Sequence, residues 1–192
     1  MTLHTIARRT FVPALAAWAL TVAVTDASAR REIPAAAARA ALEPAVAAAR
    51  SWAADAELVY LENDEPLGAT GAAPRWSFLW YSPALEASRV YSVRDGRVVV
   101  AEKFELKFAA PPLGESWLDS DAALAVADER ARSLLRDAPG LHVAHMLLGR
   151  GAFQPGQADL TTWTIVYEAE GEPSLFVVVD AASGRVCRTW RG

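Results

Sequence analysis

Hydrophobic and polar positions follow an order that occurs twice after the first 29 residues. Each copy begins with an Ala-rich segment of helical spacing, continues through a short apolar strand and a polar loop, and ends with two strands joined by a turn. The predicted helices run over about 34–54 and from Ser120 to a stop at Pro139-Gly140. The short strands that follow them are predicted at 57–61 and 141–148.

Individual residues predict where each helix starts or breaks and which of its faces is apolar. Pro44 predicts a break in the first, because proline lacks the N–H that the preceding turn requires. Ser120 is predicted to be the N-cap of the second helix, with Asp121 in its first turn. The apolar stripes expected to face a sheet are Leu42, Val46, Ala49 and Ala53 in the first helix and Leu124, Ala127, Ala131 and Leu134 in the second.

Each polar loop leads into a strand that opens with tryptophan, at 76–81 and 163–168. Alternation places Trp76, Phe78 and Trp80 on one face of the first strand and Trp163, Ile165 and Tyr167 on one face of the second. We interpret these rows as core, because burial contributes about 1.5–3 kcal/mol for each such side chain; a ligand platform is the alternative. Trp76 and Trp163 are 87 residues apart (163 − 76), and near-equal offsets at other positions indicate a duplication.

The second copy, residues 120–188, resembles a PepSY domain, the small α/β module of peptidase propeptides and many secreted bacterial proteins. The resemblance rests on the helix at 121–127, the strand at 163–167, and the strand, Asp-Ala and Gly turn at 178–186. The first copy resembles the family less, because its turn is the shorter 95–97 and its helix carries a proline. The resemblance implies a non-catalytic module that inhibits or assists a peptidase or regulates an envelope protein, with no catalytic residues to transfer.

These features predict an α+β fold of two tandem helix-on-antiparallel-sheet pseudo-repeats, each with three or four strands. The predicted domain organisation is an export signal at 1–29, a first PepSY-like repeat at 30–108, a linker at 109–118 and a second PepSY-like repeat at 119–192. The prolines of the linker predict a stiff, extended segment. Whether the two repeats share one sheet is open at this stage.

The first 29 residues have the three parts of an export signal. Arg8 and Arg9 precede an apolar stretch of 14 residues at 11–24, and Ala27-Ser28-Ala29 forms a small-residue cleavage site. The stretch is shorter than the roughly 20 residues of a membrane-spanning helix, so we predict cleavage near Ala29 and a periplasmic or secreted mature chain without a membrane span. Twin-arginine and general secretory routes both fit the paired arginines. No Cys follows the stretch, so no lipoprotein anchor is predicted.

The net charge and the single cysteine limit which partners we expect. The net charge of −4 over 192 residues argues against nucleic acid, whose binding is dominated by cationic contacts to phosphates. Cys187, the single cysteine, has no partner for an internal disulfide and is predicted to be a small buried apolar residue.

Candidate chemistry is sparse. His142 and His145 are the two histidines beyond the signal segment, and alternation along a strand would point them to opposite faces. No Cys or third His completes a metal site with them, and no Gly-x-Ser-x-Gly motif supplies a nucleophile. A catalytic triad that combines either histidine with residues distant in the sequence stays an alternative. We interpret Asp180 and Gly184 as turn residues rather than a metal or phosphate loop.

Two acidic clusters, at 62–65 and 168–172, are predicted to be ordinary solvated surface rather than an acid/base pair. The sequence thus assigns no catalytic, cofactor-binding or metal-binding residue and predicts no cofactor. We expect an exported non-catalytic binding module that acts on a peptide or an envelope protein. A peptidase is one of the expected partners. Its binding surface is expected to be an exposed strand edge or the loops before Trp76 and Trp163. The alternatives are a small exported hydrolase that uses His142 or His145 and a structural envelope component.

Overall fold

A computed structural model describes residues 34–106, 111–138, 140–150 and 160–192 of the chain. The described residues form two helices, α1 (Ala38–Trp52) and α2 (Ser120–Asp137), and eight strands. The strands are β1 (Glu57–Asn63), β2 (Arg75–Ser82), β3 (Ala87–Arg94), β4 (Arg97–Phe104), β5 (His142–Arg150), β6 (Thr161–Glu168), β7 (Leu175–Asp180) and β8 (Val186–Arg191). The predicted export signal and its cleavage site lie outside the described residues. Within the described residues, neither helix has the length and hydropathy to cross a membrane.

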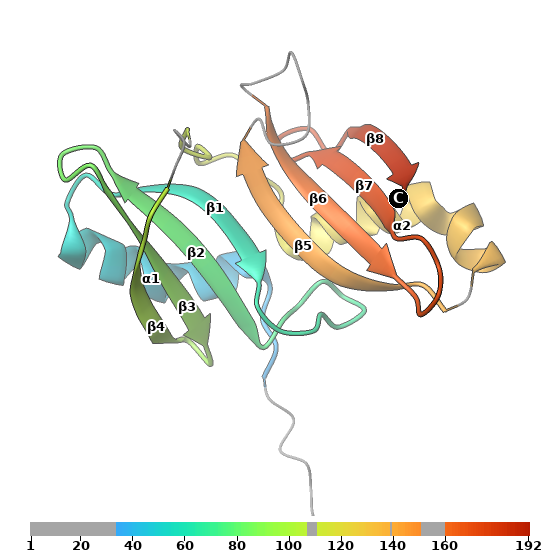
Figure 1. The fold of residues 1–192 in the computed structure, drawn as a ribbon, viewed down its shortest axis with the longest axis horizontal. Coiled ribbons are helices and arrows are strands. Elements are labelled where there is room, and N and C mark those ends of the chain that lie inside the picture. Colours follow the sequence, from blue (N-terminus) through green and yellow to red (C-terminus); the bar gives the residue numbers. More distant parts are fainter. Residues whose placement is uncertain (1–33, 107–110, 139, 151–159) are drawn as a thin grey trace, which may run out of the picture. The chain divides into compact units, whose positions relative to one another are not determined.

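All eight strands belong to one antiparallel sheet, in the order β4-β3-β2-β1-β5-β6-β7-β8 (Figure 1). The predicted fold class, two tandem helix-on-sheet pseudo-repeats, is therefore wrong, because the fold is dominated by a single sheet with only two helices in the described ranges. The physical cause is the pairing of β1 with β5, in which Tyr60, Leu61 and Glu62 face Gly149, Leu148 and Leu147. That pairing removes the two inner edges that separate units would expose.

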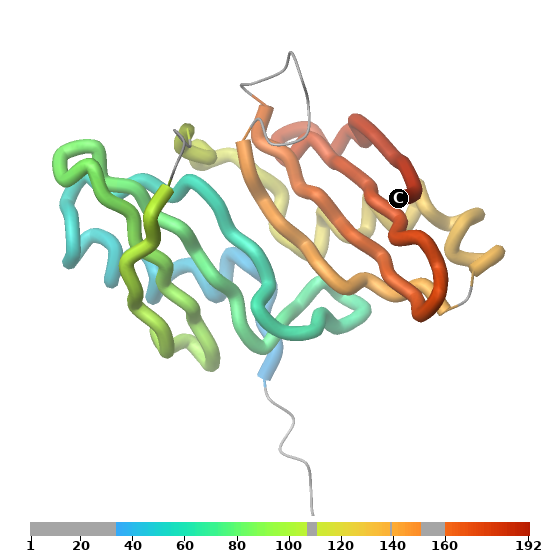
Figure 2. The backbone as a smooth tube through the Cα atoms, viewed as in Figure 1, coloured from blue at the N-terminus to red at the C-terminus, as the bar shows by residue number. Residues whose placement is uncertain are grey.

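Both helices lie on the same side of the sheet, as Figures 1 and 2 show from the opposite side. Helix α1 packs on β2 and β3, and α2 packs mainly on β7. The predicted aromatic rows face this helix side and are buried, which confirms their interpretation as core: Trp76, Phe78 and Trp80 on β2 and Trp163, Ile165 and Tyr167 on β6. The indoles of Trp76 and Trp163 meet edge to face, with ring centroids 6.3 Å apart. One core therefore continues beneath the β1–β5 junction.

Helix α1 continues through Pro44, so the predicted break is wrong. The helix buries a stripe of small side chains against the sheet: Ala38, Ala41, Ala45 and Ala49. Pro44 lies between these contacts and is itself only half-buried. We attribute the continuity to this stripe, which holds the turns on either side of Pro44 against the sheet although proline removes one backbone hydrogen bond.

The two helix N-termini meet and share their caps. The N-cap of α2 is Asp119 rather than the predicted Ser120, which is the first helical residue. Helix α1 has no side-chain cap of its own; instead the N–H of Ala38 donates to Ser120 Oγ at 3.0 Å and the N–H of Arg39 donates to Asp119 Oδ1 at 3.0 Å. Asp119 Oδ1 also accepts the N–H of Ser120 at 2.7 Å. A single carboxylate thus lies at the positive ends of both helix dipoles.

Candidate functional site

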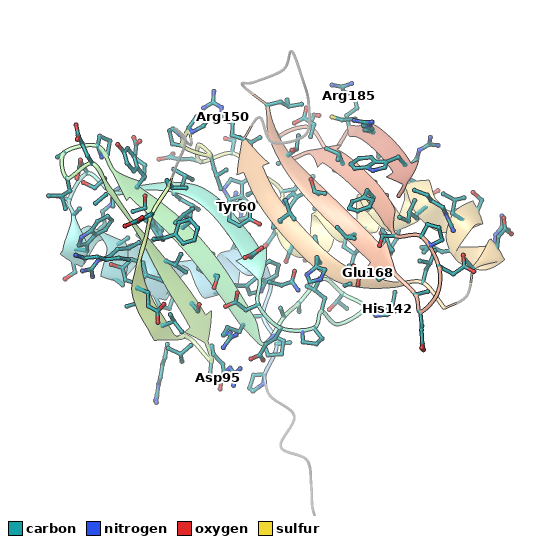
Figure 3. The ribbon with its side chains drawn as sticks, viewed as in Figure 1. Tyr60, Asp95, His142, Arg150, Glu168 and Arg185 are labelled. Atoms are coloured by element: carbon teal, nitrogen blue, oxygen red, sulfur yellow. The ribbon has the colours of Figure 1, made fainter. Side chains whose placement is uncertain are left out.

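Both histidines point to the same face of the sheet, not to opposite faces as predicted. Residue 144 forms a bulge in β5, so that His142 faces Glu168 and His145 faces Val166 on β6. The extra residue shifts the alternation by one. Figure 3 shows His142 and Glu168 together at one end of the sheet.

Both histidines lie on the surface of the described part of the chain. Both side chains are exposed, and the Nδ1 of His142 lies 3.3 Å from the carbonyl of Gly140 rather than near a hydroxyl. Across the described ranges, no three His, Cys, Asp or Glu side chains are grouped so as to hold a metal ion. An open hollow of about 610 Å³ beside α2 is lined by Val126, Glu129 and Arg130 among others, and neither histidine contributes to it.

The first acidic cluster is not the solvated surface that we predicted. Asp64 pairs with Arg75 at 3.0 Å and Glu65 with Arg94. Asn63, in the same cluster, is only 6% exposed. Asp64 and Glu65 belong to a structural network at the end of β1, because arginines from β2 and β3 pair with both carboxylates.

A second polar contact lies near the middle of the sheet, on the face away from the helices. The hydroxyl of Tyr60 donates to the Glu62 carboxylate at 2.7 Å, and Figure 3 shows Tyr60 at the β1–β5 junction. Burial, together with this hydrogen bond, raises the pKa of Tyr60 well above its ordinary value of 10.0. The Tyr60 hydroxyl is thus held as a hydrogen-bond donor to Glu62.

Asp180 and Gly184 form the predicted turn between β7 and β8. The Asp180 carboxylate accepts the N–H of Ala182 at 3.0 Å and the Ser183 hydroxyl at 2.7 Å, and Gly184 has φ of 71°. The interpretation as turn residues is confirmed. Cys187, on β8, is a half-buried free thiol, so its predicted full burial is wrong.

Of the two loops proposed as binding surfaces, the one before Trp76 is packed against the protein at Gly71 and Ala73, whereas Gly68, Ala69 and Thr70 are exposed. Gly71 has φ of +75°, and a Cβ there would lie 2.8 Å from the carbonyl oxygen of Ser120 in α2. Ala73 forms an antiparallel bridge with Ala36. Most of the loop before Trp163 lies outside the described residues. The other predicted surface, an exposed strand edge, is present at β4 and at β8.

Strand β4 is the more open edge. It is eight residues long, and all four residues from Ala101 to Phe104 are exposed. In the described part of the chain, three large hydrophobic side chains are exposed, and two of them lie on β4: Val99 (51%) and Phe104 (47%). The backbone groups on the outer side of an edge strand lack a partner strand and can pair with an added one.

Strand β8 is shorter and better covered. It has six residues, and Trp190 stacks on Phe176 of β7 with ring centroids 4.8 Å apart. Arg188 lies over the Trp190 ring at 4.7 Å, and the backbone N–H of Gly192 donates to the carbonyl of Ser174 at 3.1 Å. These contacts fix Arg188 and Trp190 onto the neighbouring strand, whereas Val99 and the residues from Ala101 to Phe104 on β4 are exposed.

The sequence does not single out the exposed residues of β4. It predicts residues 98–100 only as the returning strand of a hairpin, and the Asp95-Gly96 turn, with φ of 51° and 67°, has the positive φ values of such a hairpin. Which strand forms an edge depends on the order of strands in space. Sequence neighbours alone do not indicate that β4 has only one partner among the described strands.

A solved structure has a similar fold. A crystal structure described as a "putative lipoprotein" from Clostridium difficile 630 matches with a TM-score of 0.53 and 15% sequence identity, over 77% of this chain and 90% of that one. At that identity the likeness concerns the fold alone. No protein-family model matches the chain, and no curated protein matches it.

Proposed function

We propose that this chain is an exported, non-catalytic binding module that takes up an extended peptide segment along the edge strand β4. The observation that carries the proposal is the concentration of exposed apolar side chains, Val99 and Phe104, on an eight-residue strand with one open side. An added strand gains main-chain hydrogen bonds from such an edge and contacts from alternate side chains.

The β3–β4 hairpin is suited to hold that edge in place. Seven residue pairs join the two strands, from Arg94 with Arg97 at the turn to Ser88 with Phe104 at the far end. Strand β3 is in turn covered by α1. A peptide would therefore meet a preformed template, which reduces the entropy lost on binding.

Export is part of the proposal. The arginine pair, apolar stretch and Ala27-Ser28-Ala29 site form the predicted signal, and a protein of similar fold is described as a "putative lipoprotein". The resemblance of residues 120–188 to PepSY domains places segments of a peptidase or an envelope protein first among the peptides to test.

Proline substitution tests the proposal even while the natural partner is unidentified. Along an edge strand, the N–H groups of consecutive residues point alternately to the neighbouring strand and to solvent. Of the two variants Ala101→Pro and Glu102→Pro, one removes a backbone hydrogen bond between β4 and β3. The other removes an N–H that points away from β3 and keeps the fold. Peptides selected from a displayed random library on the mature chain should bind the correctly folded proline variant at least about tenfold more weakly.

Equivalent substitutions in β8, Arg188→Pro and Thr189→Pro, are the matched controls. The variant of that pair that folds should keep full peptide binding. Selected peptides that bind the folded β4 variant as tightly as the original chain, or that lose binding only with the β8 variant, contradict the proposal.

A further inference from the structure

We infer that β4 selects peptides in which an acidic residue is followed by a basic one between two apolar residues. The inference rests on the proposed function and names the class of its ligand. It follows from two charges, Glu102 and Lys103, near the C-terminal end of the open edge. Within the described residues neither side chain forms an ion pair, and both are exposed.

The register of β3 and β4 assigns these charges to different faces. Ala101 faces Tyr91, which is buried on the helix side, and Lys103 faces Arg89, also on that side. Glu102 faces Val90 on the opposite side of the sheet. An added strand must therefore meet a positive position on the helix side and, at the adjacent residue, a negative position on the open side.

The helix-side position is locally cationic. Lys103 is directly opposite Arg89, whose guanidinium lies over the Trp52 ring at 5.4 Å. The Nε of Arg89 is buried and has no hydrogen-bond partner. Like charges directly opposite each other are unfavourable, so a carboxylate on a strand added beside Lys103 would relieve their repulsion.

The open-side position favours a cation between two apolar residues. Val100, Glu102 and Phe104 form one row along this face of β4, because they face Ser92, Val90 and Ser88. A basic side chain opposite Glu102 gains an ion pair, and apolar side chains opposite Val100 and Phe104 cover their surface. In a peptide that pairs antiparallel with β4, the N-terminal residue of the matching segment lies opposite residue 104 and the C-terminal one opposite residue 100. From its N-terminus to its C-terminus, the order of the peptide is therefore apolar, acidic, basic, any residue, apolar.

A second copy of this chain does not satisfy the same requirement. Two β4 strands paired about a twofold axis perpendicular to the sheet bring together residues of the same face. Glu102 then cannot lie directly opposite Lys103 of the other copy, and registers centred on either residue place like charges together. A separate peptide of the stated charge order is the better match to this edge.

Two synthetic peptides of identical composition test the inference: Thr-Val-Glu-Lys-Thr-Val-Thr and its charge-swapped form Thr-Val-Lys-Glu-Thr-Val-Thr. Dissociation constants are measured from NMR shifts of β4 amides in the mature chain. The Glu-Lys peptide should bind about 2-fold to 30-fold more tightly than the Lys-Glu peptide, since two cross-strand charge pairs change sign. The protein variant Glu102→Lys/Lys103→Glu should reverse this preference, and 0.5 M salt should reduce it.

The outcomes separate the inference from the proposed function. Equal affinity for the two peptides, with binding abolished by the outward proline variant of β4, overturns the charge rule and supports β4 as a peptide edge. A preference that survives unchanged in the charge-swapped protein also overturns the rule. Binding of neither peptide, together with library peptides that ignore β4, overturns both.

Discussion

At the scale of single residues, Asn63 shows how one side chain joins the two halves of the sheet. It is the last residue of β1, and its side chain reaches past the three paired residues of the β1–β5 junction. Its Nδ2 donates to the carbonyls of Glu65 at 3.0 Å and Ala144 at 3.1 Å, and its Oδ1 accepts the N–H of Met146 at 2.7 Å. The bulge in β5 is therefore anchored by a buried amide from β1.

Replacing this amide should destabilise the protein strongly. Asn63→Ala leaves three backbone groups at a buried site without their partner, so we expect the free energy of unfolding to fall by about 2–4 kcal/mol. Urea denaturation measures the change, and Glu57→Ala, at the exposed start of the same strand, is the control with little effect. A loss below about 0.5 kcal/mol for Asn63→Ala would show that the amide does not hold the junction.

Asp180 gives a pH-dependent prediction at the same scale. Burial alone would raise the pKa of Asp180, but hydrogen bonds from Ser183 and from the N–H of Ala182 outweigh it and lower the pKa below 3.8. The charged form is thus favoured by folding, so its contribution is present above about pH 4 and is lost as the pH falls through the lowered pKa. The stability difference between the original chain and Asp180→Asn should be constant from pH 7 to pH 5 and should shrink by pH 3. Equal differences at pH 7 and pH 3 would refute this.

At the scale of elements, each helix start depends on residues from outside that helix. Asp119 and Ser120 cap α1 as well as the beginning of α2, and Arg39 of α1 lies over the Trp117 ring at 3.8 Å. The sequence predicted both helices and the start of α2 to within one residue, since capping residues and apolar spacing are local. It could not predict the shared cap, because residues about 80 positions apart meet there only after the sheet forms.

The shared cap predicts an unequal pair of effects. Asp119→Ala removes an acceptor from two helix N-termini and should lower the free energy of unfolding by about 1–3 kcal/mol. Asp121→Ala removes an exposed carboxylate that bonds only the N–H of Ala122, so a smaller loss, under about 1 kcal/mol, is expected. Thermal or urea denaturation of the two variants provides the comparison. Equal losses would mean that Asp119 caps only its own helix.

At the scale of the whole described chain, one eight-stranded sheet stands in place of the two tandem helix-on-sheet pseudo-repeats, and the repeated pattern had left open whether those repeats share a sheet. The pattern correctly placed the strands and the inward aromatic rows, because alternation and burial are properties of each segment. It could not give the joining of β1 to β5, which depends on which edges meet. It also could not show that β4 is left open, and the candidate site follows from that strand order.

A single sheet should unfold as one unit. The β1–β5 pairing, the shared helix cap and the contact of Trp76 with Trp163 all cross the junction. Far-ultraviolet circular dichroism and tryptophan fluorescence should therefore report the same urea midpoint for the mature chain. Two separated transitions would instead mean that the halves fold independently of each other.

Amide hydrogen exchange of the mature chain, with and without a selected peptide, tests the binding edge most directly. In the free chain, the outward N–H groups of residues 100–104 should exchange rapidly because no described strand pairs with that side of β4. With the peptide bound, these amides should become protected, while exchange along β8 should stay unchanged. Protection that appears on β8 or in the loops, with β4 exchanging as before, would contradict the assignment of β4 as the binding edge.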